Sequence, residues 1–411
     1  MSLTLTEGQQ AAFEAFSRFI MDPTEQVFVI EGFSGTGKST LVKTLIEQLP
    51  NIMKAARLIH PSMAEREVHL TATTNKACEA LAALSHQSVV TIHSFLGLRV
   101  NQDYRSGETT LVPRNNDVRH DCIVFIDEAS YIDPHLLELI FKRTKHCKII
   151  FMGDPAQLTP VKYNYTPVFQ ANFPTSRLTE VVRNDGLILE VSTMFRKTVE
   201  SGEFFSFTPD GHSIQYLQRP DFDQAILNEF NRPDWKHNDS KVLAWTNKCV
   251  INYNHGISAH VTGNPEFQIG DYGIVNRYMN FQGGGLKTDQ TVIVSHVGPD
   301  TYEHGVLGNF IEVDNRWSVF LPKNLADKKL AIKQARDEGA INLVAHIENN
   351  WIDLRAAYAC TINKAQGSTY KRVFIDLDDI KKCNSGNQIA RMMYVAVSRA
   401  SDQVFLTGDL V

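Results

Sequence analysis

The clearest chemistry in this sequence lies in one short segment, Gly32-Phe33-Ser34-Gly35-Thr36-Gly37-Lys38-Ser39. The segment follows an apolar run at 27–30 and precedes a helical pattern over 40–49. In that setting the glycines let backbone N–H groups approach phosphate oxygens, and the helix N-terminus adds a positive dipole. The Lys38 ammonium can reach the β- and γ-phosphates, and the Ser39 hydroxyl can hold Mg²⁺. We therefore predict an ATP-type triphosphate site formed by Gly35, Thr36, Gly37, Lys38, Ser39 and Thr40.

Two acidic residues, Asp127 and Glu128, follow a second apolar run at 123–126. We expect Asp127 to bind Mg²⁺ together with Ser39, and Glu128 to orient or deprotonate the water that attacks the γ-phosphate. The same pair could instead be a plain helix N-cap. The phosphate loop upstream favours the catalytic interpretation.

Three further residues could sense or stabilise the γ-phosphate. Gln157 lies in a polar turn that follows the apolar run at 149–152. Arg183 lies at the junction of two α/β segments, and Arg399 ends an apolar helical pattern. A guanidinium can stabilise the charge that develops in phosphoryl transfer. For any single arginine, a surface ion pair is the alternative interpretation.

Several polar loops carry hydroxyl and amide groups with a few aromatic rings, a composition that suits a sugar–phosphate strand with stacked bases. The stretch 360–369 could contact either a phosphate or a nucleic-acid backbone. Each loop alone is also consistent with an ordinary polar turn. The candidate nucleic-acid contacts are Thr73, Thr74, Asn75, His93, Phe95, Thr361, Asn363 and Lys364.

The overall composition is that of an ordinary globular protein of 411 residues, with a formal net charge of −5. This charge neither indicates nor excludes nucleic-acid binding, which depends on a local basic groove. The six cysteines form no C-x-x-C pair, so we expect reduced thiols in a cytoplasmic protein, and neither a cysteine metal site nor a disulfide framework. The start of the sequence does not resemble a secretory signal, and no apolar run is long enough for a membrane span.

The elements that must position these residues alternate between apolar strand-like runs and helical patterns, which predicts an α/β fold with parallel sheets. Strands are expected at 27–30, 68–71, 123–126 and 149–152, and a hairpin-like insertion at 97–117. A second α/β segment begins near residue 184, with strands at 241–245, 372–377 and 404–407. A β-rich, barrel-like insert with a helix over 324–338 interrupts this segment. The predicted domains are a first lobe at 1–183, a second lobe at 184–260 with 348–411, and an insertion at 261–347.

Taken together and in order, these segments resemble the motifs of superfamily 1 helicases. The phosphate loop and the stretches 127–130, 153–157, 364–369 and 395–399 look like motifs I, II, III, V and VI. The segment 5–9 looks like the adenine-reading Q-motif, with Gln9 as the reader. The sequence is most similar to Dda-type phage helicases of the B branch, which are related to RecD-type enzymes. The segments 91–94, 178–181 and 246–248 also match that group.

This resemblance implies two RecA-like parallel-sheet motor lobes, with a hairpin inserted in the first and a small SH3-like β domain in the second. The hairpin would separate the strands, with Tyr104 or Leu111 as pin residue. Thr246 and Asn247 would join the DNA contacts, and Gln366 with Gly367 would contact the nucleotide. Two departures are visible: Asn363 stands where these enzymes usually carry His, and the inserted domain is shorter.

The function that we expect from the resemblance is an ATP-driven, Mg²⁺-dependent DNA helicase that moves 5′ to 3′ on single-stranded DNA and unwinds forked duplex. It would act as a monomer in a bacterial or phage-infected cytoplasm, in replication or recombination, and its partners could include single-stranded-DNA-binding or replisome proteins. A translocase that displaces bound proteins without unwinding is one alternative. A P-loop kinase or small-molecule ATPase and a nucleotide-gated loader of partner proteins are two others.

Overall fold

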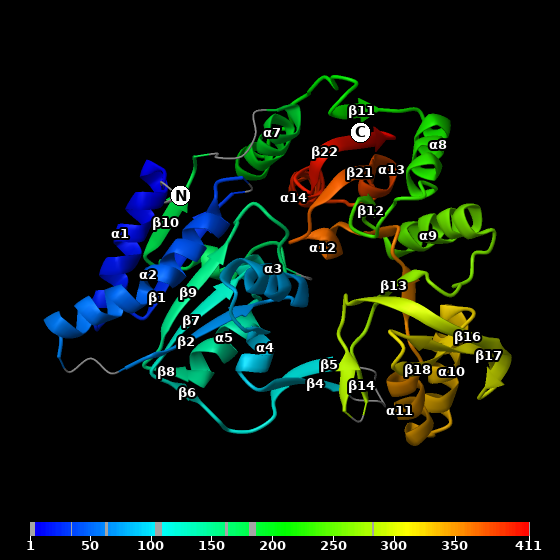
Figure 1. Cartoon of the computed structure of the whole chain (residues 1–411), viewed down its shortest axis with the longest axis horizontal. Helices are drawn as coiled ribbons and strands as arrows, with labels where there is room; N and C mark the ends of the chain where they lie inside the picture. Colours follow the sequence, from blue (N-terminus) through cyan, green and yellow to red (C-terminus); the bar gives the residue numbers. More distant parts are fainter. Residues whose placement is uncertain are drawn as a thin grey trace. The chain divides into compact units, whose positions relative to one another are not determined.

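The computed structural model describes residues 5–33, 35–61, 65–102, 109–160, 163–180, 186–281 and 283–410 (Figure 1). The described chain forms two compact units. The first consists of Met1–Arg99, Leu111–Ser206 and Ser385–Ser398, and the second of Val100–Thr110, Phe207–Asn384 and Arg399–Val411. The predicted lobe boundaries at 183, 260 and 347 stay a prediction.

The first unit is built on a six-stranded parallel sheet with the strand order β10-β1-β9-β7-β2-β3. The strands that the sequence predicts at four positions are confirmed. The bounds of the sheet strands are β1 Val27–Gly32, β2 Glu67–Ala72, β3 Val89–Thr91, β7 Cys122–Asp127, β9 Lys148–Gly153 and β10 Thr175–Leu178. Because the strands are parallel, β1, β2, β7 and β9 all end at one edge of the sheet, where ligands bind in such folds.

Both faces of this sheet are covered, which explains why its strands are almost continuously apolar. One core cluster joins Phe28 and Phe125 to Phe16 of α1, and the other joins Val29 and Val124 to α5. The helices of this unit are α1 Glu7–Met21, α2 Lys38–Ile59, α3 Asn75–Ser85, α4 Ile92–Phe95, η1 Ala129–Tyr131, α5 Pro134–Arg143, α6 Pro167–Gln170, α7 Leu187–Ser201 and α14 Gly386–Val397.

The buried lysine Lys148, at the start of β9, fixes α1 to the sheet. Its Nζ donates to the carbonyl oxygens of Phe19, Asp22 and Glu25 at 2.7, 2.6 and 2.8 Å, just where α1 ends. Burial, with a contribution from the nearby charge of Arg66, lowers the pKa of Lys148 to about 8. The cation therefore satisfies carbonyl groups that the helix end leaves without partners.

Two small sheets lie outside the main one. Strands β4 Leu98–Gln102 and β5 Thr109–Pro113 form a two-stranded sheet in the region where the sequence predicts a hairpin, and β6 Arg119–His120 pairs with β8 Thr144–Lys145. Leu111 packs against the core of the first unit, whereas Tyr104 lies outside the described residues. The role of this segment as a strand-separating pin stays a prediction.

The second unit contains a five-stranded parallel sheet with the order β11-β22-β21-β12-β20. Its strands are β11 Ile214–Tyr216, β12 Ser240–Ala244, β20 Ala359–Thr361, β21 Tyr370–Asp376 and β22 Ala400–Thr407. The aromatic side chains of Phe222, Phe230 and Phe374 form the centre of its core. The associated helices are α8 Arg219–Phe230, α9 Asn247–Thr262, α12 Ile362–Ala365 and α13 Leu377–Ile380.

An antiparallel sheet with the order β18-β17-β16-β13-β19 occupies the rest of the second unit. Its strands are β13 Tyr272–Val275, β16 Thr291–Glu303, β17 Val306–Val313, β18 Trp317–Pro322 and β19 Leu354–Ala356, next to a small hairpin of β14 Met279–Phe281 and β15 Gly284–Leu286. Helices α10 Leu325–Asp337 and α11 Ile341–Asn350 pack on Phe320 and Trp351. The helix that the sequence predicts over 324–338 is confirmed by α10, and the SH3-like assignment stays a prediction.

The described helices include none with the length and apolar character that crossing a bilayer requires.

Candidate nucleotide site and nucleic-acid loops

The phosphate loop connects β1 to α2, as its sequence predicts. Gly35 and Gly37 have φ values of 84° and 72°, and Gly37 is the residue that precedes the first turn of α2. Glycine adopts this left-handed backbone without the steric cost that a Cβ brings. The loop therefore delivers Lys38 at the helix N-terminus, where backbone N–H groups and the helix dipole favour a phosphate.

Gln9 ties the first turn of α1 to this loop. Its Nε2 donates to the carbonyl oxygens of Thr36 and Gly37 at 3.2 and 3.3 Å, and its Oε1 accepts from the backbone N–H of Thr6 at 3.1 Å. The Thr36 hydroxyl also donates to the carbonyl oxygen of Phe33 at 2.8 Å. The structure thus gives Gln9 a loop-holding contact, while its reading of adenine stays a prediction.

The two predicted catalytic acids lie at the end of β7. Asp127 Oδ1 is 3.8 Å from Lys38 Nζ and accepts from the backbone N–H of Glu128 at 2.9 Å. Glu128 is buried (8 % exposed) and has a left-handed backbone with φ 53°. The Thr73 hydroxyl donates to the Glu128 carbonyl oxygen at 2.9 Å, and the Thr73 N–H donates to the Asp127 carbonyl oxygen at 3.1 Å. A left-handed non-glycine residue costs free energy, and such residues concentrate at functional sites.

The electrostatics of Asp127 suit a divalent cation. Burial raises the pKa of its carboxyl, Glu128 raises it further, and the Lys38 ammonium opposes the shift. A buried carboxylate next to a second carboxylate gains most from a cation with oxygen preference, which is the chemistry of Mg²⁺. Asp127 therefore fits the predicted role of a Mg²⁺ ligand. The side chain of Ser39, the other predicted ligand, lies outside what the structure describes.

The turn that carries Gln157 is held by helix α14. Tyr394 donates its hydroxyl to Asp154 Oδ2, and Arg391 Nη1 donates to the carbonyl oxygens of Pro155 and Gln157, each at 2.6 Å. Asp154 is fully buried, and burial raises the pKa of its carboxyl. The turn and α14 are therefore one hydrogen-bonded assembly within the first unit.

The sequence reasoning missed both residues of α14 that make these bonds. Arg391 and Tyr394 are polar groups on an otherwise apolar helix that ends directly before Ser398 and Arg399. Burial lowers the pKa of Arg391, against the opposing charge of Asp154. Two hydrogen-bonding side chains spaced three apart on a buried helix are a signal that could have identified them.

The polar loops of the first unit begin short helices. Thr74 caps α3 by accepting from the Ala77 N–H at 3.2 Å, and Asn75 is the first residue of that helix. Burial lowers the pKa of His93, with Asp133 opposing the shift. Phe95 is only 4 % exposed and packs on His69, with ring centroids 4.8 Å apart. The structure gives Phe95 a core position, and its predicted contact with DNA bases stays a prediction.

In the second unit, the buried Asp379 fixes the start of α9. It accepts from the backbone N–H groups of Trp245 and Thr246 at 2.9 and 2.7 Å and from the Thr246 hydroxyl at 2.8 Å. Asn247 Oδ1 accepts from Arg355 Nη1 at 2.7 Å. Asp379 and Arg355 position the two predicted DNA contacts, and the sequence reasoning missed them because their partners are distant in the chain.

The stretch 361–369 and Arg399 lie together. Thr361 caps α12, and Lys364 pairs with Asp289 at 2.7 Å. Gly367 has a φ of 77°, and Arg399, 7 % exposed, donates to the Ser368 carbonyl oxygen at 3.1 Å. Gln366 is buried and Asn363 is half-buried in the same segment. The structure therefore brings Gln366, Gly367 and Arg399 into one neighbourhood, and Arg183 lies outside the described residues.

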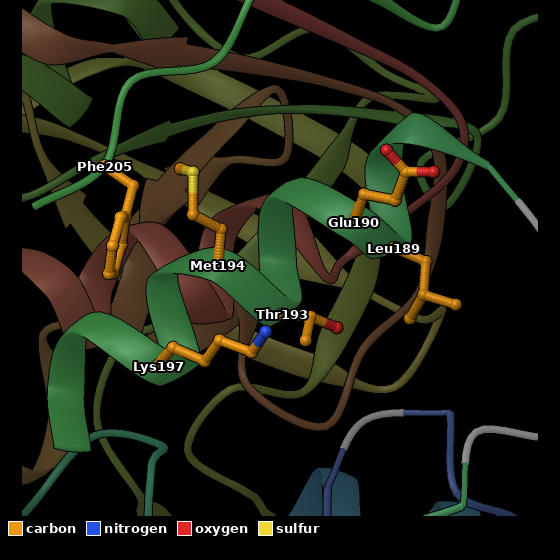
Figure 2. Close-up of a pocket in the computed structure, with 6 residues that line it drawn as sticks. All are labelled: Leu189, Glu190, Thr193, Met194, Lys197 and Phe205. Atoms are coloured by element: carbon orange, nitrogen blue, oxygen red, sulfur yellow. The ribbon is translucent and has the colours of Figure 1, made fainter. Parts of the chain in front are cut away.

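A surface hollow of about 520 Å³ lies along α7, as Figure 2 shows. Its lining contains no predicted site residue. The side chains are those of Leu189, Glu190, Thr193, Met194, Lys197 and Phe205.

Comparison with known proteins agrees with this geometry. The AAA domain family matches residues 4–210, and the UvrD-like helicase C-terminal domain matches residues 356–407. The ATP-dependent DNA helicase dda of Enterobacteria phage T4 is 28 % identical over 61 % of this chain and 56 % of its own length. The RecBCD enzyme subunit RecD of Buchnera aphidicola is 31 % identical over 35 % of this chain and 24 % of its own length. The chain thus matches about half of the first relative and a quarter of the second.

Solved structures show the same fold. A structure of two coordinating Pif1 helicases at forked double-stranded DNA has a TM-score of 0.52 at 16 % identity, covering all of this chain and 93 % of that one. Pif1 helicase from Bacteroides, in complex with ADP-AlF3 and single-stranded DNA, has a TM-score of 0.51 at 15 % identity, covering all of this chain and 94 % of that one. The likeness confirms the expected two-lobe RecA-like fold. This chain therefore belongs to the AAA domain family, and it is similar to the helicases Dda and RecD.

Proposed function

We propose that this chain is an ATP-driven, Mg²⁺-dependent DNA helicase that moves 5′ to 3′ along single-stranded DNA and opens forked duplex. The observation that carries the proposal is the set Lys38, Asp127 and Glu128 at one sheet edge, with the Gln157 turn bonded to the helix that leads to Arg399. A nucleotide kinase needs no such connection between its γ-phosphate sensor and a helix from the far end of the chain.

Each residue of the site has a definite role in this proposal. Lys38 binds the β- and γ-phosphates, and Asp127 with Ser39 holds Mg²⁺, which neutralises phosphate charge when bound. Glu128 accepts the proton of the attacking water. Gln157, Gln366, Arg183 and Arg399 sense or stabilise the γ-phosphate.

The bonds of α14 offer a route by which hydrolysis reaches the rest of the chain. Arg391 holds two carbonyl oxygens of the Gln157 turn, so a movement of Gln157 on loss of the γ-phosphate displaces α14. Arg399 follows α14 directly and is bonded to the Ser368 carbonyl oxygen, beside the Thr361–Lys364 segment proposed to bind DNA. In this proposal the chain itself carries the displacement from α14 to Arg399 and so links nucleotide state to DNA binding.

The choice of DNA as the track rests on the relatives. The phage relative is an ATP-dependent DNA helicase, one Pif1 structure addresses unwinding at forked double-stranded DNA, and another is a complex with single-stranded DNA. The loops at 73–75, 246–247 and 361–364 supply hydroxyl, amide and ammonium groups suited to a nucleic-acid backbone.

Strand separation on partial duplexes tests direction and activity together. With ATP, duplexes carrying a 5′ overhang should unwind and those carrying a 3′ overhang should not. The reverse preference would overturn the proposed polarity. ATP-dependent displacement of a protein from single-stranded DNA, with no strand separation on either substrate, would identify a translocase instead.

ATP hydrolysis with and without single-stranded DNA tests the site. Lys38→Ala should abolish the DNA-stimulated rate, whereas Lys43→Ala, on the same helix and partly exposed, should keep it. Full stimulated turnover by Lys38→Ala would show that the phosphate site is misassigned.

A further inference from the structure

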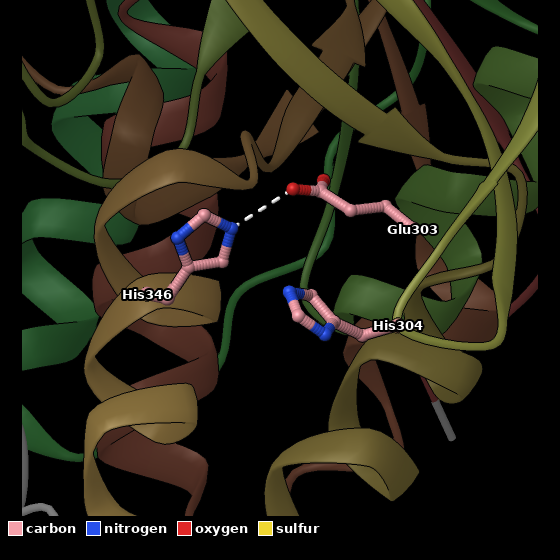
Figure 3. A group of neighbouring side chains, drawn as sticks. All are labelled: Glu303, His304 and His346. Carbon is pink, nitrogen blue, oxygen red and sulfur yellow. Dashed lines mark hydrogen bonds and ion pairs between the residues drawn. The ribbon is translucent and has the colours of Figure 1, made fainter.

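The turn between β16 and β17 brings two side chains with metal-binding capacity against a third on α11. Glu303 ends β16, His304 follows it in the turn, and His346 lies on α11 (Figure 3). One ligand atom from each residue lies within 4.8 Å of the others. We propose that Glu303, His304 and His346 bind one Zn²⁺ ion or a similar transition-metal cation, which fastens the β16–β17 turn to α11.

The geometry is close to that of a three-ligand zinc site. His346 Nε2 lies 2.8 Å from Glu303 Oε1, and the rings of His304 and His346 are 5.2 Å apart between centroids. In a tetrahedral zinc site with bonds of about 2.0–2.1 Å, ligand atoms lie about 3.3 Å apart. Glu303 and His346 are already in contact. To complete the site, a ring nitrogen of His304 must move closer to them, and the exposed side chain of His304 can rotate to do so.

The second oxygen of Glu303 gives independent support. Among the residues that the structure describes, Glu303 Oε2 is buried from solvent and receives no hydrogen bond. A buried carboxylate oxygen without a partner is costly, and a bound ion is one means of satisfying it. A plain Glu303–His346 hydrogen bond leaves this oxygen unsatisfied.

Asn350 can orient His346 for metal binding. Its side-chain amide lies 3.2 Å from His346 Nδ1, one helical turn along α11. Metal binding by Nε2 requires the neutral tautomer with its single proton on Nδ1, so the ring gives its Nε2 proton to solvent and takes one from solvent at Nδ1. The Asn350 amide oxygen, after rotation of the amide group, then accepts that proton, as outer partners of metal-bound histidines do.

The ligand types select the class of metal. Two imidazoles and one carboxylate suit Zn²⁺, Co²⁺ or Ni²⁺, whereas Mg²⁺ and Ca²⁺ prefer oxygen ligands alone. A fourth position open to water completes the tetrahedron. The site uses no cysteine and is separate from the residues proposed to hold Mg²⁺ with ATP, so it does not depend on the proposed helicase activity.

Calorimetric titration of Zn²⁺ into the nucleotide-free full chain, prepared without a histidine tag, tests the proposal. The wild-type protein should bind about one equivalent that excess Mg²⁺ does not displace. His304→Ala and His346→Ala should lose binding over the range in which the wild type saturates, and Asn350→Ala should weaken it about tenfold. His296→Ala, an exposed histidine earlier on β16, should bind like the wild type.

Cobalt absorption reports the ligand types directly. Bound Co²⁺ should show tetrahedral ligand-field bands without thiolate-to-cobalt charge transfer. Thiolate bands, no binding by the wild type, or unchanged binding by both His304→Ala and His346→Ala would overturn the proposal.

Discussion

At the scale of single residues, the nucleotide site depends on two acids whose environments differ from that of a surface carboxylate. Asp127 and Glu128 are neighbours in sequence, and the left-handed backbone of Glu128 turns its side chain away from the direction that a continuing strand would give. Thr73 holds that backbone by donating twice, to the Asp127 and Glu128 carbonyl oxygens. These tertiary contacts thus fix the backbone from which the two acidic side chains project.

Removing the charge of Glu128 should separate binding from hydrolysis. Glu128→Gln keeps the side-chain volume but cannot accept the proton of the attacking water, so DNA-stimulated hydrolysis should fall by about 10²–10⁴-fold while ATP affinity is retained. Steady-state hydrolysis and equilibrium binding of a fluorescent ATP analogue measure the two effects. Glu79→Gln, an exposed acid on α3, is the matched control, and hydrolysis by Glu128→Gln at the control rate would rule out the base role.

The buried lysine Lys328 makes the free energy of unfolding depend on pH. Lys328 on α10 donates to the Trp351 carbonyl oxygen, and burial, with the nearby charge of Arg277, lowers its pKa to about 8 from an ordinary value of 10.5. Below pH 8 the lysine is charged in both the folded and the unfolded chain, and the folded state bears the full free-energy cost of burying that charge. Between pH 8 and 10.5 the folded chain sheds this proton first, so folding gains stability as the pH rises.

Lys328→Met should remove this penalty. One pKa unit corresponds to about 1.4 kcal/mol of differential stabilisation. Because the variant also loses the hydrogen bond to Trp351, which offsets part of the gain, it should be more stable at pH 7 by on the order of 2 kcal/mol. Urea unfolding followed by tryptophan fluorescence should show this advantage at pH 7 and its decline toward pH 10. Lys329→Met, at the neighbouring exposed position, is the control, and an advantage that stays constant with pH would contradict the assignment.

At the scale of elements, helix α14 connects the nucleotide site to the end of the chain. Its bonds to the Gln157 turn run through Arg391 and Tyr394, and the helix packs on α7. Packing alone would not transmit a small displacement of the turn with fixed direction. Two hydrogen bonds from one guanidinium fix the orientation of the planar group relative to the turn, which is the geometry that a directional coupling requires.

Breaking this connection should impair coupling more than nucleotide binding. Arg391→Ala leaves the Pro155 and Gln157 carbonyl oxygens without that donor, so DNA should stimulate ATP hydrolysis at least tenfold less, which corresponds to a barrier higher by about 1.4 kcal/mol. ATP affinity should change little, because Lys38 and the phosphate loop are intact. Gln388→Ala on the same helix should behave like the wild type, and normal stimulation in Arg391→Ala would place the coupling elsewhere.

The elements also show where local sequence signals fail. The pattern predicts a helix over 40–49, but α2 continues through Pro50 to Ile59. Proline removes one backbone donor and usually ends a helix. Here the buried side chains of Ile52 and Ala56 continue the apolar face of α2, and their burial outweighs the lost hydrogen bond.

At the scale of the whole molecule, a net charge of −5 means that the proposed DNA binding requires local cations. Lys364 is one of these in the proposal, and in the DNA-free structure it is paired with Asp289. A phosphate must then replace that carboxylate, which makes binding sensitive to salt. Each phosphate contact on a single strand contributes about −0.7 to the slope of log affinity against log salt concentration.

Lys364→Ala should therefore reduce the slope for an oligothymidine strand by about 0.7 and weaken binding for all base sequences alike. Fluorescence anisotropy over a series of salt concentrations measures this slope. Lys371→Ala removes a comparable lysine, paired with Asp239 at 2.9 Å, and should leave the slope unchanged. Equal slopes for the wild type and Lys364→Ala would mean that Lys364 does not contact phosphate.

The sequence by itself determined the parallel α/β fold, the phosphate loop and the two acids, because each depends on residues that are adjacent in the chain. Apolar runs fix strands, and Gly35 and Gly37 fix the loop whatever surrounds them. Only the tertiary structure decided that Arg391 and Tyr394 hold the Gln157 turn, that Asp379 holds Thr246, and that Phe95 is buried. The hydrogen bonds join segments that are more than a hundred residues apart, and the burial of Phe95 depends on which face of its helix is covered. Neither kind of contact leaves a periodic signal in a single sequence.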